Sequence, residues 1–176
     1  MTDVDLRALA DRLEIHQALM RYCRGIDRGD AELIQSAYHD DGVDRHFESE
    51  PVAAADFARQ AVEVVDGWTR ITQHHVTNVL IELDGDTAAV ESYYLGVQPT
   101  PREDGTEALS MIGGRYLDRF ERRDGRWAIA DRLVVIDWSR EELSGEDWAL
   151  VAQFPQGGRR EADPSHGFFK SEGGAR

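Results

Sequence analysis

The chain has 176 residues, with 34 acidic against 20 basic side chains and a formal net charge of −14. A chain of this length can bury a core as one domain without disulfides or structural metals. Because acidic side chains prevail and no basic stripe stands out, the long-range field repels nucleic acid and anionic membranes. We therefore expect neither a nucleic-acid partner nor a membrane partner.

The single cysteine, Cys23, excludes an internal disulfide and a zinc site built from several cysteines. The N-terminal stretch MTDVDLRALADRLEIH is charged throughout, and no apolar run approaches the ~20 residues of a membrane-spanning helix. We expect a soluble protein of the cytoplasm.

Helical periodicity dominates the first part of the chain. Apolar residues at steps of three and four predict a helix from Asp3 to about Gly29, with a main stripe of Leu9, Leu13, Met20 and Cys23 and a flanking stripe of Leu19, Tyr22 and Ile26. Gly29 and Asp30 predict a helix stop and a new N-cap, after which AELIQSAYH (31–39) predicts a short second helix. We expect a loop and then a short strand in DDGVDRHFE (40–48), and a third helix in the alanine-rich segment 53–68.

From Thr72 onward the period changes to two. TQHHVTNVLIEL and TAAVESYYLGVQ, separated by DGD, predict a β-hairpin over residues 72–98. A second hairpin is predicted over residues 108–138, again with an Asp-Gly turn. Segment 139–154 predicts one short helix, and the Gly-rich, charged residues 155–176 predict a tail that is ordered where a partner subunit holds it.

Helices followed by antiparallel strands predict an α+β fold, in which the helices cover one face of a curved sheet and enclose a cavity with it. We place the domain at residues 1–140 and a C-terminal extension at residues 141–176.

Ionisable residues on apolar faces are informative, because burying an unpaired charge costs several kcal/mol. Asp27 lies seven residues after Met20 and four after Cys23, so helical geometry keeps it on their face. The alternative is a position at a fraying helix end, where Asp27 binds nearby backbone or pairs with Arg24 or Arg28.

His74 alternates with Thr72, Val76, Asn78 and Leu80, whereas its neighbour His75 points to the other side of the strand. Adjacent histidines that point in opposite directions do not chelate one metal together. The sequence leaves open which side is inside, and a packed or surface histidine is the alternative to a catalytic one.

Arg132 is the clearest candidate, because its row of the last strand otherwise carries Ala128, Ala130, Val134, Ile136 and Trp138. A guanidinium on so apolar a row needs a carboxylate, a substrate anion or carbonyl groups as partners. The alternative is a structural pair with a buried acid such as Glu91. Four tyrosines could line a cavity or serve as core packing: Tyr22, Tyr93, Tyr94 and Tyr116.

An acid, a histidine and an arginine on three different elements predict proton-transfer chemistry. The aspartate would orient the imidazole, the imidazole would remove a proton, and the arginine or a tyrosine would stabilise negative charge. No GxSxG motif is present and Cys23 lies on an apolar helix stripe, so elimination or isomerisation is favoured over acyl transfer. Phosphate-binding glycine loops are also missing from the sequence.

Three stretches, RYCRGIDRGD, TQHHVTNVLIELDGDTA and GGRYLDRFERRDGRWAIADR, together with the order of elements, resemble the SnoaL-like branch of the nuclear transport factor 2-like superfamily. The resemblance covers roughly residues 6–138 and implies a cone-shaped α+β barrel whose mouth opens to a pocket. It is strongest for the group with scytalone dehydratase, bile acid 7α-dehydratase and hexachlorocyclohexane dehydrochlorinase, which are lyases that use an Asp-His pair and no cofactor.

Carried over by motif, the family's aspartate falls on Asp27, its histidine on His74 and its arginine on Arg132. The tyrosine five residues before the aspartate falls on Tyr22. SMIGGRYLDRF has no histidine where scytalone dehydratase has one, so scytalone is not the expected substrate. Relatives place another pocket aromatic after the second helix, where this chain offers His46 or Phe47.

The resemblance thus implies a cofactor-independent, dehydratase-like lyase for a cyclic, largely apolar small molecule. The alternatives are a ketosteroid-type isomerase or polyketide cyclase, and a non-catalytic ligand-binding or accessory subunit, because this fold alone implies little about chemistry. A homodimer or homotrimer is expected, and the sequence does not choose between them.

Overall fold

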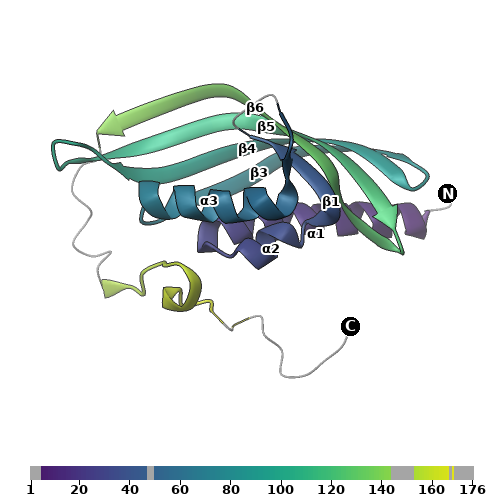
Figure 1. Cartoon of the computed structure of the whole chain (residues 1–176), viewed down its shortest axis with the longest axis horizontal. Helices are drawn as coiled ribbons and strands as arrows, with labels where there is room; N and C mark the ends of the chain where they lie inside the picture. The colour runs from purple at the N-terminus through teal and green to yellow at the C-terminus, as the bar shows by residue number, and fades with distance from the viewer. Residues whose placement is uncertain (1–4, 47–49, 144–152, 167, 169–176) are drawn as a thin grey trace.

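The computed structural model describes residues 5–46, 50–143, 153–166 and 168 (Figure 1). Its helices lie on one face of a curved six-stranded sheet with the order β2-β1-β6-β5-β4-β3, in which only β1 and β6 run parallel. The predicted α+β fold, with N-terminal helices on a mainly antiparallel sheet, is confirmed. The elements are α1 (Leu6–Arg28), α2 (Ala31–Gln35), β1 (Tyr38–Arg45), β2 (Val52–Ala53), α3 (Ala54–Trp68), β3 (Gln73–Asp84), β4 (Thr87–Pro101), β5 (Glu107–Arg123), β6 (Arg126–Leu143) and a 3-10 turn, η2 (Arg160–Ala162).

Helix α1 begins and ends at capping residues. The Asp5 side chain accepts hydrogen bonds from two backbone N–H groups of the first turn, and Gly29 ends the helix in the left-handed conformation, with φ of 64°. The predicted stop at Gly29 is therefore confirmed. Asp30 then caps α2 by accepting the Leu33 N–H at 2.9 Å, as predicted.

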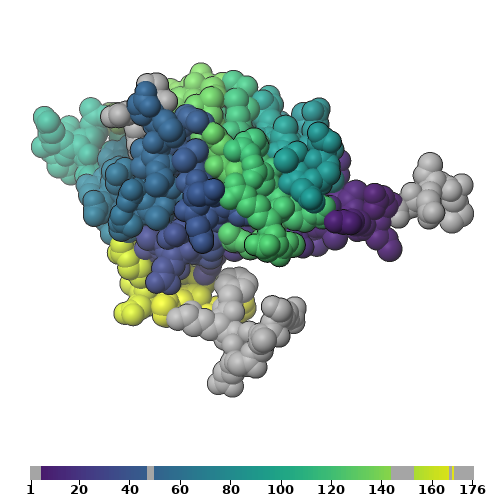
Figure 2. All heavy atoms as spheres, turned by 45° about the vertical axis from the view of Figure 1, so that its right-hand side comes forward, coloured from purple at the N-terminus to yellow at the C-terminus, as the bar shows by residue number. Residues whose placement is uncertain are grey.

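The predicted main stripe of α1 is wrong in its first half. Leu9 and Leu13 are 57% and 59% exposed, whereas the flanking residues Leu19 and Tyr22 are buried. The orientation of this part of α1 follows from a polar contact. Asp11 faces the sheet, where it accepts hydrogen bonds from Arg122 and from Trp127 Nε1 at 3.0 and 2.9 Å. The leucines are thereby directed to solvent, and Figure 2 shows this start of α1 (purple) projecting from the molecule.

Helix α2 is shorter than predicted, because Tyr38 and His39 belong to strand β1. Sheet pairing overrides local helical preference there: the Ile129 N–H donates to the Ala37 carbonyl at 2.9 Å, and β1 continues beside β6. The loop predicted from residue 40 is likewise strand as far as Arg45.

Both predicted hairpins are confirmed, but β6 is longer than expected. It runs to Leu143, so the helix predicted over residues 139–154 is wrong for residues 139–143, and residues 144–152 lie outside the described residues. The division of the chain at residue 140 stays a prediction.

Strand β3 contains an irregularity that changes its faces. Asn78 has a φ of 49°, and the pairing with β4 shifts register between Thr77 and Leu80. The more buried side chains are therefore His74 and Val76 before the bulge, and Val79 and Ile81 after it. Leu80 is 58% exposed. The prediction that His74 and Leu80 share a face is wrong because the bulge inserts one residue between them.

The described tail residues lie against helices of their own chain (Figures 1 and 2). Arg160 and Arg159 pair with Asp66 of α3, and Arg28 of α1 pairs with Asp163 at 3.3 Å. These contacts join residues 153–166 to α1 and α3 of the same chain, and the expected role of a partner subunit in ordering the tail stays a prediction.

Candidate active site

Asp27 and His74 are in direct contact, although 46 residues separate them in the chain. Asp27 lies in the last turn of α1, and its Oδ1 accepts a hydrogen bond from His74 Nδ1 at 2.7 Å. Its Oδ2 accepts the backbone N–H of His74 at 3.1 Å. The side chains are 14% and 16% exposed, respectively. One carboxylate thus fixes both the imidazole and the strand that carries it.

The Asp27 contact determines which ring nitrogen of His74 can accept a proton. With Nδ1–H donating to the carboxylate, the lone pair lies on Nε2. Nε2 forms no hydrogen bond with any described residue. Its neighbour on the paired strand is Gly96, where a Cβ would stand 3.8 Å from Nε2. Because residue 96 is glycine, no side chain of β4 covers this nitrogen at that position.

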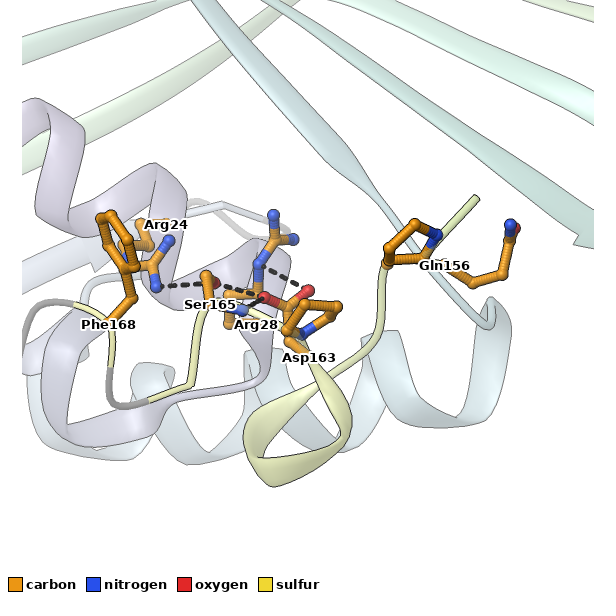
Figure 3. A pocket seen from close by; sticks show the side chains of 9 residues that line it. Arg24, Arg28, Gln156, Asp163, Ser165 and Phe168 are labelled. Carbon is orange, nitrogen blue, oxygen red and sulfur yellow. Dashed lines mark hydrogen bonds and ion pairs between the residues drawn. The ribbon is translucent and has the colours of Figure 1, made fainter. Parts of the chain in front are cut away.

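Arg24 and Arg28, the alternative partners of the Asp27 carboxylate, contact residues of the C-terminal tail instead. Arg24 donates to Ser165 Oγ at 3.0 Å, and Arg28 pairs with Asp163. Figure 3 shows both arginines beside these tail residues, at a pocket of about 570 Å³ between α1 and the tail. The partner of the Asp27 carboxylate is therefore His74 and neither arginine.

Arg132 lies inside the molecule and is paired with an acid that the sequence reasoning missed. Its Nε and Nη2 donate to the two oxygens of Asp118 at 2.7 Å each, and both side chains are 0% exposed. Glu91, the acid considered for this role, instead contacts Arg115 at 3.4 Å. Burial acts to lower the pKa of Arg132, but Asp118 and nearby tyrosines hold it well above its ordinary value.

Two tyrosine rings pack against the Arg132 guanidinium, with the ring centres of Tyr22 and Tyr116 at 4.1 and 4.2 Å from its Cζ and an edge-to-face contact between the two rings. The third nitrogen, Nη1, is buried and has no hydrogen-bond partner among the residues that the structure describes. A buried donor without an acceptor is costly, so Nη1 is the atom of this cluster suited to a ligand oxygen. Burial also raises the pKa of Tyr22 well above its ordinary value, with Asp44 adding to the rise.

The structure therefore brings the four candidates together as two pairs, Asp27 with His74 and Tyr22 with Arg132. A layer of aromatic rings connects the pairs. Tyr94 lies 6.4 Å from His74 between ring centres, and Tyr94 stacks on Tyr116 at 4.5 Å. The cavity expected between sheet and helices stays a prediction.

Asp118 could have been found by the criterion that identified Arg132. It lies on the inward row of β5 with Tyr116 and Phe120, where an acid is out of place. Of the two residues expected to supply a further pocket aromatic, His46 follows β1 directly and stacks on Phe57 at 4.7 Å, whereas Phe47 lies outside the described residues.

Cys23 is buried, and burial raises the pKa of its thiol to about 12, so the thiolate needed for nucleophilic chemistry is disfavoured. Within the described ranges no group of three or more histidine, cysteine or acidic side chains is arranged to hold a metal ion. No helix of the described chain is long and apolar enough to cross a membrane.

Comparison with protein families places the chain. The model of the SnoaL-like domain matches residues 7–133, and the chain therefore belongs to this family. Among curated proteins no sequence matches significantly.

Solved structures share the fold. A hexachlorocyclohexane dehydrochlorinase, LinA type 3, from Novosphingobium barchaimii LL02 is 22% identical, with a TM-score of 0.70 over 83% of this chain and 99% of that one. A protein of Novosphingobium aromaticivorans, provisionally assigned as a scytalone dehydratase, is 18% identical, with a TM-score of 0.66 over 79% and 91%. A Mycobacterium tuberculosis protein of unknown function is 25% identical, with a TM-score of 0.62 over 73% and 77%. The fold is thus the cone-shaped α+β fold of the nuclear transport factor 2-like superfamily.

Proposed function

We propose that this SnoaL-like protein is a cofactor-independent lyase that eliminates water from a cyclic, largely apolar small molecule. The observation that carries the proposal is the contact between Asp27 and His74, which leaves Nε2 as the basic nitrogen of the imidazole. Neighbours in the family fold that are dehydratases or dehydrochlorinases support the same reaction class.

In the proposed reaction His74 Nε2 removes a proton from carbon next to a carbonyl group. Asp27 stabilises the imidazolium that forms, because its carboxylate already accepts the Nδ1–H. Arg132 Nη1 donates a hydrogen bond to the oxygen on which negative charge develops, and the Tyr22 ring packs against that guanidinium. The bulk of the ligand would lie against the aromatic layer.

Two probe reactions test the base. 5-Nitrobenzisoxazole opens when a base removes its ring proton and the N–O bond breaks, which releases a yellow phenolate that needs no protonation. 3-Hydroxycyclohexanone loses water to give an absorbing enone. His74→Ala is expected to lower kcat/KM for both by about 100-fold or more. The matched control is His75→Gln, because His75 is the neighbouring, exposed histidine of β3.

Equal rates for the wild-type protein and His74→Ala would contradict the assignment of the base. Migration of the double bond of cyclohex-3-enone without loss of water from the hydroxyketone would instead support the isomerase alternative. Binding of these compounds without turnover would support the non-catalytic alternative.

We also propose that the protein is a homodimer or homotrimer. Large apolar side chains are exposed on neighbouring parts of the sheet, including Tyr93, Leu133 and Trp138 at 43%, 41% and 49%. Sedimentation equilibrium measures the state directly, and a monomer at micromolar concentration would contradict it.

A further inference from the structure

Tyr94 stands beside His74 on the inner face of the sheet. Every second residue of β4 is buried, and Tyr94 belongs to this buried row together with Gly96. Gly96 pairs with His74 across the β3–β4 ladder, so Tyr94 lies two positions along β4 from the partner of the histidine. The two ring centres are 6.4 Å apart. The imidazole and the phenol are therefore neighbours at one end of the aromatic layer.

Glycine at position 114 lets the Tyr94 ring lie where it does. The ring stacks on Tyr116, with centres 4.5 Å apart and planes 9° apart. A Cβ on Gly114 would stand 2.8 Å from Tyr94 Cε1 and 3.0 Å from its hydroxyl oxygen, which is too close for an ordinary contact. The second glycine of IGGR (112–115), a stretch that fits no phosphate-binding motif, thus makes room for the phenol.

The Tyr94 hydroxyl has no protein partner in the described part of the chain. Tyr94 is 8% exposed, and its hydroxyl forms no hydrogen bond with a described residue. A buried tyrosine hydroxyl usually has a partner, as that of Tyr38 has in Asp44 at 2.6 Å. Burial raises the pKa of Tyr94 to about 12, and the negative charge of Asp137 adds to the rise. The phenol therefore keeps its proton at neutral pH and is a donor for a ligand oxygen.

The elimination proposed above needs a proton donor as well as a base. Hydroxide is a poor leaving group, so the departing oxygen must be protonated as the C–O bond breaks. This oxygen is bound to the carbon next to the one that loses its proton, so the donor must lie close to His74. Among the described tyrosines, Tyr94 is the one whose ring lies next to the imidazole, whereas Tyr22 packs against Arg132.

We propose that the Tyr94 hydroxyl protonates the leaving oxygen of the substrate. The inference rests on the proposed function and narrows its substrate class to cyclic β-hydroxycarbonyl compounds, in which the acidic C–H and the C–O bond occupy adjacent carbons. Base and donor then act on neighbouring atoms of one ligand, which the 6.4 Å between their ring centres permits.

Atoms and electrons balance in this step. The α-proton passes to His74 Nε2, and the C–H electron pair forms the C=C bond. The C–O bond breaks with its electron pair on the oxygen, which takes the Tyr94 proton and leaves as water. The imidazolium then returns a proton to the phenolate, so both residues regain their starting state. The product is the conjugated enone, and the step needs no further reactant.

Tyr94→Phe tests the assignment, because phenylalanine keeps the ring and removes only the hydroxyl. We expect kcat for loss of water from 3-hydroxycyclohexanone to fall about 100-fold or more, and ring opening of 5-nitrobenzisoxazole, which expels a stable phenolate, to change less than about threefold. The matched control is Tyr93→Phe, because Tyr93 is 43% exposed on the other face of β4. It should leave both rates at wild-type values, whereas His74→Ala should lower both.

A ketone with a better leaving group gives the sharpest comparison. 3-(4-Nitrophenoxy)cyclohexanone loses the same α-proton but expels 4-nitrophenolate, which needs no protonation. Tyr94→Phe should therefore eliminate nitrophenolate at nearly the wild-type rate while it fails to eliminate water, with Tm measured to show that the variant is folded. Equal losses on the two ketones would show that the hydroxyl only positions the ketone, and would overturn the assignment.

Every other outcome also decides the question. If Tyr94→Phe lowers dehydration and ring opening equally, or lowers neither, the assignment is wrong. Wild-type ring opening without dehydration of the hydroxyketone overturns it as well. Failure of the base assignment is distinct, because His74→Ala then leaves both rates unchanged. If the wild-type protein catalyses neither reaction, the proposed function fails, and the role of Tyr94 fails with it.

Discussion

The Asp27–His74 and Arg132–Asp118 pairs have the same closest distance, 2.7 Å, but different surroundings. Arg132 and Asp118 are wholly buried and joined by two parallel hydrogen bonds, whereas Asp27 and His74 remain partly exposed. In both pairs the carboxylate uses both of its oxygens, and in both one nitrogen of the basic partner has no hydrogen bond to a described residue: Nη1 of the buried Arg132 and Nε2 of the partly exposed His74. These two nitrogens are therefore more informative about chemistry than the ion pairs themselves.

The largest effect on stability is expected from Asp118→Ala. The variant leaves the buried guanidinium uncompensated, which costs about 3–5 kcal/mol of unfolding free energy. Urea unfolding measures this loss. The control is Asp137→Ala, which is expected to cost far less, because Asp137 pairs with Arg115 at the surface, where solvent screens the interaction. Equal losses in the two variants would show that burial does not distinguish these pairs.

Asp27→Asn is expected to show the reverse pattern, a large kinetic effect with a small effect on stability. The amide no longer stabilises the imidazolium, so kcat/KM for 5-nitrobenzisoxazole should fall about 100-fold. The unfolding free energy should change by about 1 kcal/mol, because the group is near the surface. A variant with unchanged ring-opening kinetics would remove Asp27 from the mechanism.

Gly96→Val tests whether a ligand approaches the unbonded Nε2 of His74 along β4. A Cβ at this position makes only ordinary contact with Nε2, but the branched methyl groups of valine extend beyond it. We expect KM for the probe to rise about tenfold, with Gly96→Ala close to wild type. If both variants bind the probe like wild type, the ligand does not approach along β4.

The smallest effect is expected at the tail. Burial acts to raise the pKa of Asp163, but hydrogen bonds from Ser165 and from the Gly158 N–H lower it to about 2. A lowered carboxyl pKa stabilises the attached tail above the ordinary value of 3.8, and this stabilisation is lost as the pH falls towards 2. The protection of residues 157–165 against hydrogen exchange, taken relative to the intrinsic exchange rate at each pH, should therefore fall below about pH 4 in the wild-type protein. In Asp163→Asn this protection should be low throughout; identical pH profiles would contradict the linkage.

Much of this architecture is encoded locally and was predictable. Gly29 and Asp30 carry their capping signals themselves, and the hairpins follow from Asp-Gly turns between alternating strands. Asp27, His74 and Arg132 stood out because each breaks an apolar row, and the family resemblance assigned them to one site. Their catalytic roles stay predictions.

Features that depend on distant partners were not predictable in the same way. The outward turn of Leu9 depends on where Arg122 and Trp127 place Asp11. Likewise the tail lies where it does because Asp66, more than 90 residues earlier, binds its arginines. Such contacts leave no periodic signal in the sequence, since neither partner is unusual in its own segment.

The bulge at Asn78 has a consequence for how this protein can vary. It divides β3 into two stretches, and the side-chain alternation of one is independent of the other. Insertions in the distal half of the hairpin can therefore accumulate without rotating His74 away from Asp27. A single deletion at Asn78 itself would exchange the inner and outer rows of the distal half. Asn78 therefore separates a distal half of β3 that can tolerate insertions from a proximal half that must keep His74 beside Asp27.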